Sequence, residues 1–102
     1  MDEKTINLGD TIKLSGFQDE DGSTMVIVKK MVGNYVKKIA ESVEGFQNIS
    51  VNLKKLHQHD GEGGKNELHV KLLAGKVYTA EVIEFNLYIA IDKAFKKVMA
   101  EC

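Results

Sequence analysis

The sequence predicts a single α+β domain, a two-layer sandwich in which two helices pack on one face of a four-stranded mixed sheet in the order βαβββα. Its 102 residues are enough for one hydrophobic core. Two segments repeat apolar residues at the helical period, and four shorter ones alternate apolar and polar residues as strands do. Because each strand has one apolar face, we expect the helices to cover that face and to leave the other in water.

The first predicted strand follows a polar segment. Residues 1–10 contain only isolated apolar side chains, so we expect a flexible N-terminal segment there and a single domain over 11–102. In the strand at 11–15, Ile12 and Leu14 alternate with polar residues and share one face.

The longer helix is predicted to begin near Met25, with Ser23 or Thr24 as its N-terminal cap, and to end at Gly45. The β-branched run 25–28 is also compatible with a strand. We favour a helix because the helical period continues for about four turns. The apolar positions that follow it are 28, 31, 32, 35, 36, 39 and 43.

The second half of the chain predicts three strands and a helix. Residues 48–54, 68–72 and 77–83 alternate as strands, and the reversal at 74–76 makes the last two an antiparallel hairpin. Asn86 is expected to cap the second helix. Its predicted core residues are Leu87, Ile91, Ala94, Phe95 and Val98. The helix that joins the first two strands makes them parallel.

Composition limits the function classes. All fourteen basic residues are lysine, against fifteen acidic residues, and the net charge is -1 with a pI of about 6.3. This balance is not that of a strongly basic nucleic-acid-binding protein, so only a local patch could bind nucleic acid. Cys102 is the single cysteine, and no hydrophobic run reaches 18 residues. We therefore expect a cytoplasmic protein without membrane contact.

One local patch lies on the first predicted helix. On a helical wheel Lys29, Lys30 and Lys37 surround Gly33, which leaves bare backbone between three positive charges. A phosphate strand could approach this backbone closely. In the alternative interpretation the lysines are a solvated face, and Gly33 admits a close-packed neighbour or is merely tolerated.

A cluster of possible metal ligands occurs at His57, His59, Asp60 and Glu62. Imidazole and carboxylate groups can bind zinc, but this spacing is not diagnostic. Ordering a glycine-rich loop around an ion would have a considerable entropic cost. The sequence therefore favours a solvated loop, and we expect no metal site and no cofactor.

Catalytic residues are not indicated. No Ser-His-Asp or Cys-His set can be assembled from the spacing, so we expect that the protein is not an enzyme. His69 alternates with Leu68 and Val70, which predicts a surface histidine on the wet face of the sheet.

The segment 86–97 resembles the second-helix signature of the short ribosome hibernation-promoting factors, also called ribosome-associated translation inhibitors. The matching residues are Asn86, Tyr88, Ala90, Ile91, Asp92 and Lys97. A weaker resemblance extends over residues 11–98. It implies a βαβββα fold similar to double-stranded-RNA-binding domains, and binding at the decoding region of the small ribosomal subunit through basic residues of the helices. By this resemblance Lys29, Lys38 and Lys97 match basic positions of the family.

Together these observations predict a ribosome-associated RNA-binding domain that inhibits translation or stabilises idle ribosomes. Its predicted RNA contacts are Lys29, Lys30, Gly33, Lys37, Lys38, Lys93, Lys96 and Lys97. The partner would be the small ribosomal subunit or another structured RNA. The alternative is a protein-interaction or homodimerising module without RNA, which would use the free sheet face or an edge strand.

Overall fold

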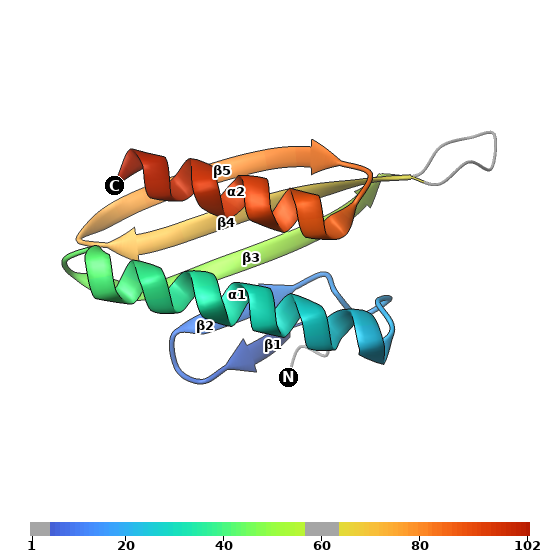
Figure 1. Ribbon diagram of the computed structural model, residues 1–102, viewed down its shortest axis with the longest axis horizontal. Helices are drawn as coiled ribbons and strands as arrows, with labels where there is room; N and C mark the ends of the chain where they lie inside the picture. Colours follow the sequence, from blue (N-terminus) through green and yellow to red (C-terminus); the bar gives the residue numbers. More distant parts are fainter. Residues whose placement is uncertain (1–4, 57–63) are drawn as a thin grey trace.

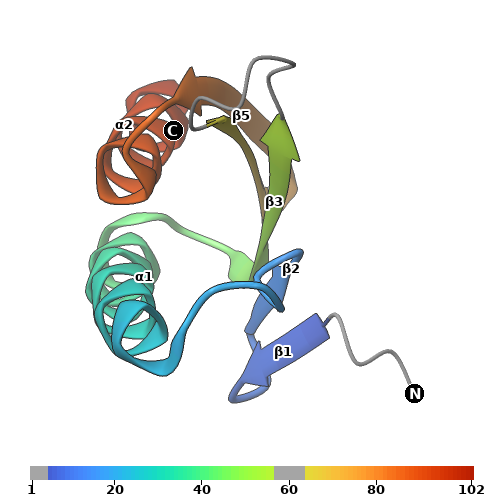
Figure 2. The same ribbon diagram turned by 90° about the vertical axis from the view of Figure 1, so that its right-hand side faces the viewer.

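The computed structural model describes residues 5–56 and 64–102. Its elements are β1 (Thr5–Leu8), β2 (Ile12–Ser15), α1 (Gly22–Ser42), β3 (Phe46–Leu56), β4 (Lys65–Ala74), β5 (Lys76–Glu84) and α2 (Leu87–Glu101). Both helices lie side by side on one face of a single sheet (Figures 1 and 2). The predicted α+β architecture, with its helices on one face, is confirmed.

The strands lie in the order β1-β2-β3-β4-β5. β2 and β3 are parallel, because α1 crosses over between them, and every other neighbouring pair is antiparallel. This mixed pattern is the one that the sequence predicts for the strands near 11–15 and 48–54. The hairpin of β4 and β5 turns at Gly75, whose φ of 78° lies in the left-handed region that glycine adopts easily.

The prediction of four strands is wrong, because the sheet has a fifth. Thr5–Leu8, which we placed in a flexible segment over 1–10, forms β1 and pairs antiparallel with β2. Ile6 lies opposite Leu14 and Leu8 opposite Ile12, and both side chains pack against the core. Two apolar residues are too few for the alternation to identify a strand, so only pairing with β2 makes this one recognisable.

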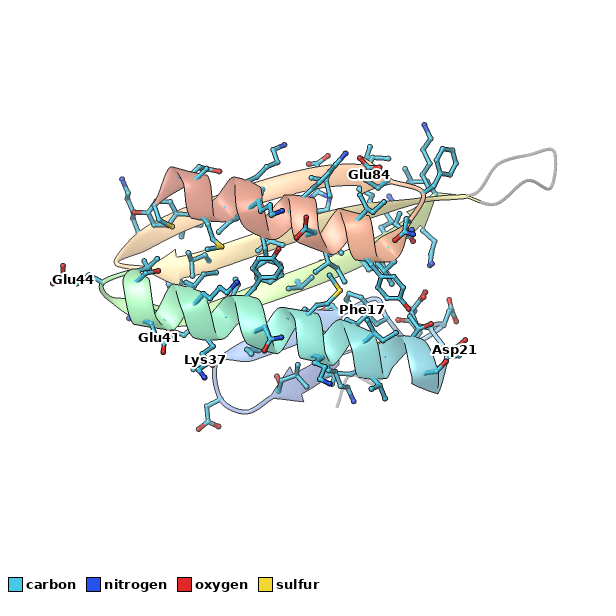
Figure 3. All side chains as sticks on the ribbon, viewed as in Figure 1. Phe17, Asp21, Lys37, Glu41, Glu44 and Glu84 are labelled. Atoms are coloured by element: carbon cyan, nitrogen blue, oxygen red, sulfur yellow. The ribbon has the colours of Figure 1, made fainter. Side chains whose placement is uncertain are left out.

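The core lies between the helices and the sheet (Figure 3). On α1 the buried residues are Val28, Val32, Val36 and Ile39. On α2 they are Leu87, Ala90, Ile91, Ala94, Phe95 and Val98. The predicted stripe of α2 is buried, with Ala90 added, whereas the predicted Met31, Tyr35 and Val43 are only partly buried and pack against the core. Phe17 in the β2–α1 connection completes the core with 2% of its surface exposed. The opposite face of the sheet is open to solvent and mainly polar, with Val77 and Ile83 of β5 as exposed apolar residues.

The first helix begins earlier than predicted. Its cap is Asp21, whose carboxylate accepts hydrogen bonds from the Thr24 N–H at 2.7 Å and from the Ser23 hydroxyl at 2.9 Å. Ser23 and Thr24 are therefore residues of the first turn. The helix ends at Ser42 rather than at Gly45, whose φ of 80° turns the chain into β3.

The second helix is capped as predicted. The Asn86 side chain accepts hydrogen bonds from the N–H groups of Tyr88 and Ile89. Because this cap satisfies two of the free donors of the first turn, it fixes where α2 begins after β5.

Candidate nucleic-acid interface

A group of lysines on α1 is free of internal partners. Lys29, Lys30 and Lys37 are exposed, and none of them has a hydrogen bond or ion pair with any residue in 5–56 or 64–102. Glu41 lies one turn after Lys37 and forms no ion pair with it within those ranges. We call Lys29, Lys30, Gly33 and Lys37 the α1 lysine face.

Gly33 opens the centre of this face. A Cβ atom built at this position would meet no heavy atom within 4 Å, so no close-packed neighbour explains the glycine. The interpretation that Gly33 makes room for a close-packed neighbour is thereby excluded. The backbone at Gly33 is instead bordered by the flexible side chains of Lys29 and Lys37, one turn to either side.

The lysines of α2 already form ion pairs or hydrogen bonds within the protein. Lys93 pairs with Glu84 at 2.6 Å and Lys96 with Asp92 at 2.9 Å. Lys97 donates a hydrogen bond at 3.1 Å to the backbone carbonyl of Glu81 on β5. The three lysines of α2 are thus paired with Asp92 on the same helix and with groups of β5.

The two sets of lysines do not lie on one surface. Lys93 and Lys97 reach β5, the edge strand beside α2. The labelled Lys37 points away from α2 (Figure 3). Of the eight predicted RNA-binding residues, the structure therefore places four together on α1 and sets Lys93 and Lys97 apart from them at β5, while Lys96 pairs with Asp92.

Lys38 lies between the helices. Its ammonium group is 5.7 Å from the centre of the Tyr35 ring, at a distance where a cation and a ring attract each other. Both residues line a groove of about 220 Å³, together with Met31, Asn34 and Asp92. Lys38 therefore faces the junction of α1 and α2, where Lys96 of α2 pairs with Asp92.

Tyr35 and Asp92 join the two helices. The Tyr35 hydroxyl donates a hydrogen bond to Asp92, and its ring stacks on Phe95 with 5.0 Å between ring centres. Burial, followed by the Asp92 carboxylate, raises the pKa of Tyr35 to about 12. The hydrogen bond from Tyr35, together with that from Lys96, lowers the pKa of Asp92. Asp92 is thus a fixed negative charge at the junction.

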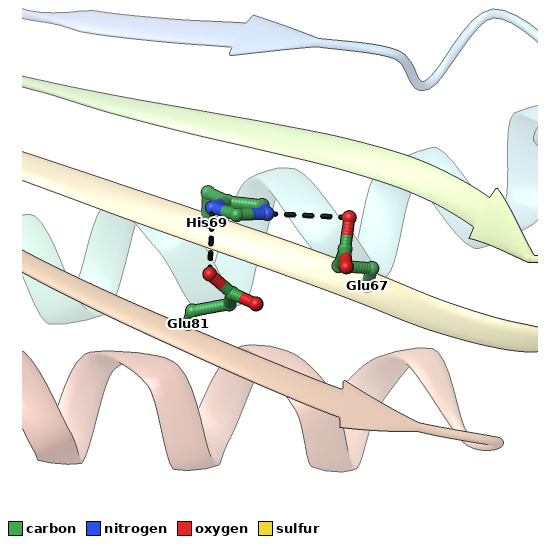
Figure 4. Close-up of side chains that lie close together, drawn as sticks. All are labelled: Glu67, His69 and Glu81. Atoms are coloured by element: carbon green, nitrogen blue, oxygen red, sulfur yellow. Dashed lines mark ion pairs between the residues drawn. The ribbon is translucent and has the colours of Figure 1, made fainter.

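A second cluster, on the free face of the sheet, was not predicted from the sequence. His69 lies on the free face of the sheet, as predicted, but Glu67 and Glu81 lie on either side of its ring (Figure 4). The period of a strand could have placed Glu67 beside His69, since they are two residues apart. Glu81 could be found only from the pairing of β4 with β5. The predicted ligand cluster at residues 57–62 lies outside the residues that the structure describes.

Comparisons with known proteins find no family model that matches the chain and no curated protein that matches it. Within the part of the chain that the structure describes, neither helix is long and apolar enough to cross a lipid bilayer.

Proposed function

We propose that this domain binds structured RNA, with the small ribosomal subunit as partner, and that binding inhibits translation or stabilises idle ribosomes. The proposal rests on the α1 lysine face, where three exposed lysines that have no partner among residues 5–56 and 64–102 surround a glycine with open space before it. The resemblance of residues 86–97 to the hibernation-promoting factors supports the choice of ribosomal RNA. No other described cluster of cations is both unpaired and held on one rigid helix.

The mechanism is electrostatic. Lysine binds phosphate as a point charge, and each phosphate that it neutralises releases counterions from the RNA. A helix holds side chains one turn apart at about 5–6 Å, so Lys29 and Lys37 flank the Gly33 backbone at fixed distances. A phosphate strand can then lie against bare backbone between two ammonium groups. Binding of this kind positions an RNA by its shape and is weakened by salt.

The lysines of α2 can contribute to RNA binding by exchanging their carboxylate partners for phosphate groups. Lys93 and Lys96 are more than half exposed in their ion pairs. Exposed ion pairs of this type stabilise a protein by about 0–1 kcal/mol, so exchanging a carboxylate for a phosphate has a small cost. We therefore expect α1 to supply most of the affinity and α2 a smaller, additional part.

Co-sedimentation with ribosomes at low and high salt tests the proposal. Replacing Lys29, Lys30 and Lys37 with glutamate should abolish association at low salt, because attraction becomes repulsion on one face. The matched control replaces Lys13, Lys54 and Lys71 with glutamate. These three exposed lysines alternate with buried residues of β2, β3 and β4 and so lie on the free sheet face.

Both triple variants change the net charge equally, from -1 to -7, since each of three substitutions removes two units. The control should therefore retain association if a specific face binds RNA. No association of the unmodified protein at low salt would refute the RNA proposal. Equal loss in both variants would show only a dependence on net charge and would remove the α1 lysine face from the proposal.

A second candidate function, association through the sheet, is favoured by one observation. β5 is an edge strand of nine residues, and Val77 and Ile83 on it are 51% and 46% exposed. An exposed edge can pair with a second chain, although Lys97 covers the Glu81 carbonyl on this one. The mass of the protein in solution tests this candidate. A dimer that Val77→Lys dissociates would support it, and a monomer would exclude it.

A further inference from the structure

Glu67, His69 and Glu81 form a compact group on the sheet face opposite the helices (Figure 4). Glu67 and His69 alternate with the buried residues Leu68 and Val70, so they point away from the core. Glu81 lies directly opposite His69 in the antiparallel pairing of β4 and β5. Two adjacent strands of a five-stranded sheet therefore fix all three positions. This group is separate from the α1 lysine face.

We propose that this group binds one divalent transition-metal ion, of which Zn²⁺ is the best match, with His69 and Glu67 as ligands and Glu81 orienting the His69 ring. One ligand atom from each of the three residues lies within 4.8 Å of the others. The combination of an imidazole with carboxylates distinguishes the group from a purely acidic cluster. Backbone pairing already orders its residues, so binding requires little further ordering.

The contacts of the His69 ring assign the roles. Its Nε2 atom is 3.3 Å from Glu67 Oε2, and its Nδ1 atom is 3.5 Å from Glu81 Oε2. The two ring nitrogens point in different directions, so one ion can use only one of them. With the ion at Nε2, the Nδ1–H donates to Glu81, which is the carboxylate–histidine–metal arrangement found at many metal sites.

The spacing agrees with a zinc ion. Zn–N and Zn–O bonds of about 2.0–2.1 Å in tetrahedral geometry separate neighbouring ligand atoms by about 3.3 Å. His69 Nε2 lies 3.3 Å from Glu67 Oε2, so an ion can enter with small side-chain rotations. Imidazole favours zinc, copper and nickel over calcium and magnesium, which prefer oxygen ligands alone.

Solvent completes the coordination. The His69 side chain is 43% exposed, so water can reach its ring. Lys54 lies opposite Glu67, and Lys71 follows His69 on the same face. Their positive charge opposes a bound cation, so we expect a site of modest affinity that exchanges with solvent zinc.

The test uses the whole chain with His57 and His59 replaced by alanine, so that His69 is the single remaining histidine. Titration with Zn²⁺ is followed by the NMR signals of the imidazole and by calorimetry. We expect a saturable shift of the His69 signals, with no comparable response to Mg²⁺. Adding His69→Ala should abolish the heat of binding. Glu67→Gln should weaken binding at least tenfold, and Glu81→Gln by about 10–100-fold.

Glu44→Gln is the matched control, since Glu44 is an exposed carboxylate outside this group, and it should bind Zn²⁺ unchanged. The side chains of His69, Glu67, Glu81 and Glu44 are exposed or partly exposed, and circular dichroism verifies that each variant is folded. The proposal is overturned if the His69 signals do not respond to Zn²⁺, or if the His69→Ala variant binds the ion as tightly as its parent.

Discussion

Gly33 is a residue at which stability and the proposed RNA binding favour different side chains. It lies within α1, where glycine is about 1 kcal/mol less favourable than alanine, and a Cβ there would meet no atom within 4 Å. We therefore predict that Gly33→Ala raises the free energy of unfolding by about 1 kcal/mol, as measured by urea denaturation. If the open backbone contacts phosphate, the same substitution weakens co-sedimentation with ribosomes.

Gly16→Ala should have the opposite effect on stability to Gly33→Ala. Gly16 has a φ of 84°, and a Cβ atom there would lie 1.9 Å from the backbone carbonyl oxygen of Leu53. We expect this variant to be strongly destabilised, because β2 and β3 would have to separate to relieve the overlap. A stabilised Gly16→Ala, or a destabilised Gly33→Ala, would contradict the packing described for these two glycines.

Folding raises the pKa of the Tyr35 hydroxyl strongly. Its folded pKa of about 12 lies above the ordinary value of 10.0, so folding favours the protonated phenol. The stabilisation is complete below pH 10 and is lost as the pH rises from 10 towards 12. We predict that Tyr35→Phe removes the tyrosinate absorbance that develops near pH 12 and leaves the ring stacked on Phe95.

The same substitution should lower the free energy of unfolding at neutral pH by about 1 kcal/mol, the net effect of one hydrogen bond. Asp92 also loses the largest cause of its lowered pKa, so its pKa should rise towards 3.8. NMR titration of the Asp92 carboxyl measures this change. An unaltered Asp92 titration would show that the hydrogen bond between the two helices is absent in solution.

At the scale of the element, the beginning of α1 depends on one charged cap. Hydrogen bonds from Thr24 and Ser23 lower the pKa of Asp21, so its contribution to stability is present above pH 3.8 and is lost as the pH falls through the folded pKa. We predict that Asp21→Ala lowers the melting temperature at pH 7 but has little effect in strong acid. Thermal unfolding followed by circular dichroism across this pH range measures the difference.

Two variants separate the hydrogen-bonding role of Asp21 from the effect of its negative charge. Asp21→Asn keeps an oxygen that can accept from the Thr24 N–H, so it should retain most of the stability and lose the pH dependence. Asp19→Ala removes an exposed acid of the same loop that has no hydrogen bond or ion pair with any described residue, and it should be nearly neutral. If Asp21→Ala and Asp19→Ala lowered the melting temperature equally, Asp21 would act only through its negative charge.

At the scale of the whole molecule, the two-layer architecture separates the two proposed sites. The α1 lysine face lies in the helical layer, and Glu67, His69 and Glu81 lie on the opposite face of the sheet (Figures 2 and 4). Distant sites usually make independent contributions. We predict that His69→Ala leaves ribosome association unchanged and that the α1 glutamate variant leaves Zn²⁺ binding unchanged. Either cross-effect would contradict this independence.

The sequence alone determined the helices, four of the strands, the parallel pair and the lysines of α1. These depend on local periodicity and on the length of a crossover, which neighbouring residues specify. Only the tertiary structure showed that Thr5–Leu8 is a strand and that Lys93 and Lys97 have partners on β5. It alone brought Glu81 to His69. Each of these depends on contacts between residues far apart in the chain or on side-chain direction, which no local pattern encodes.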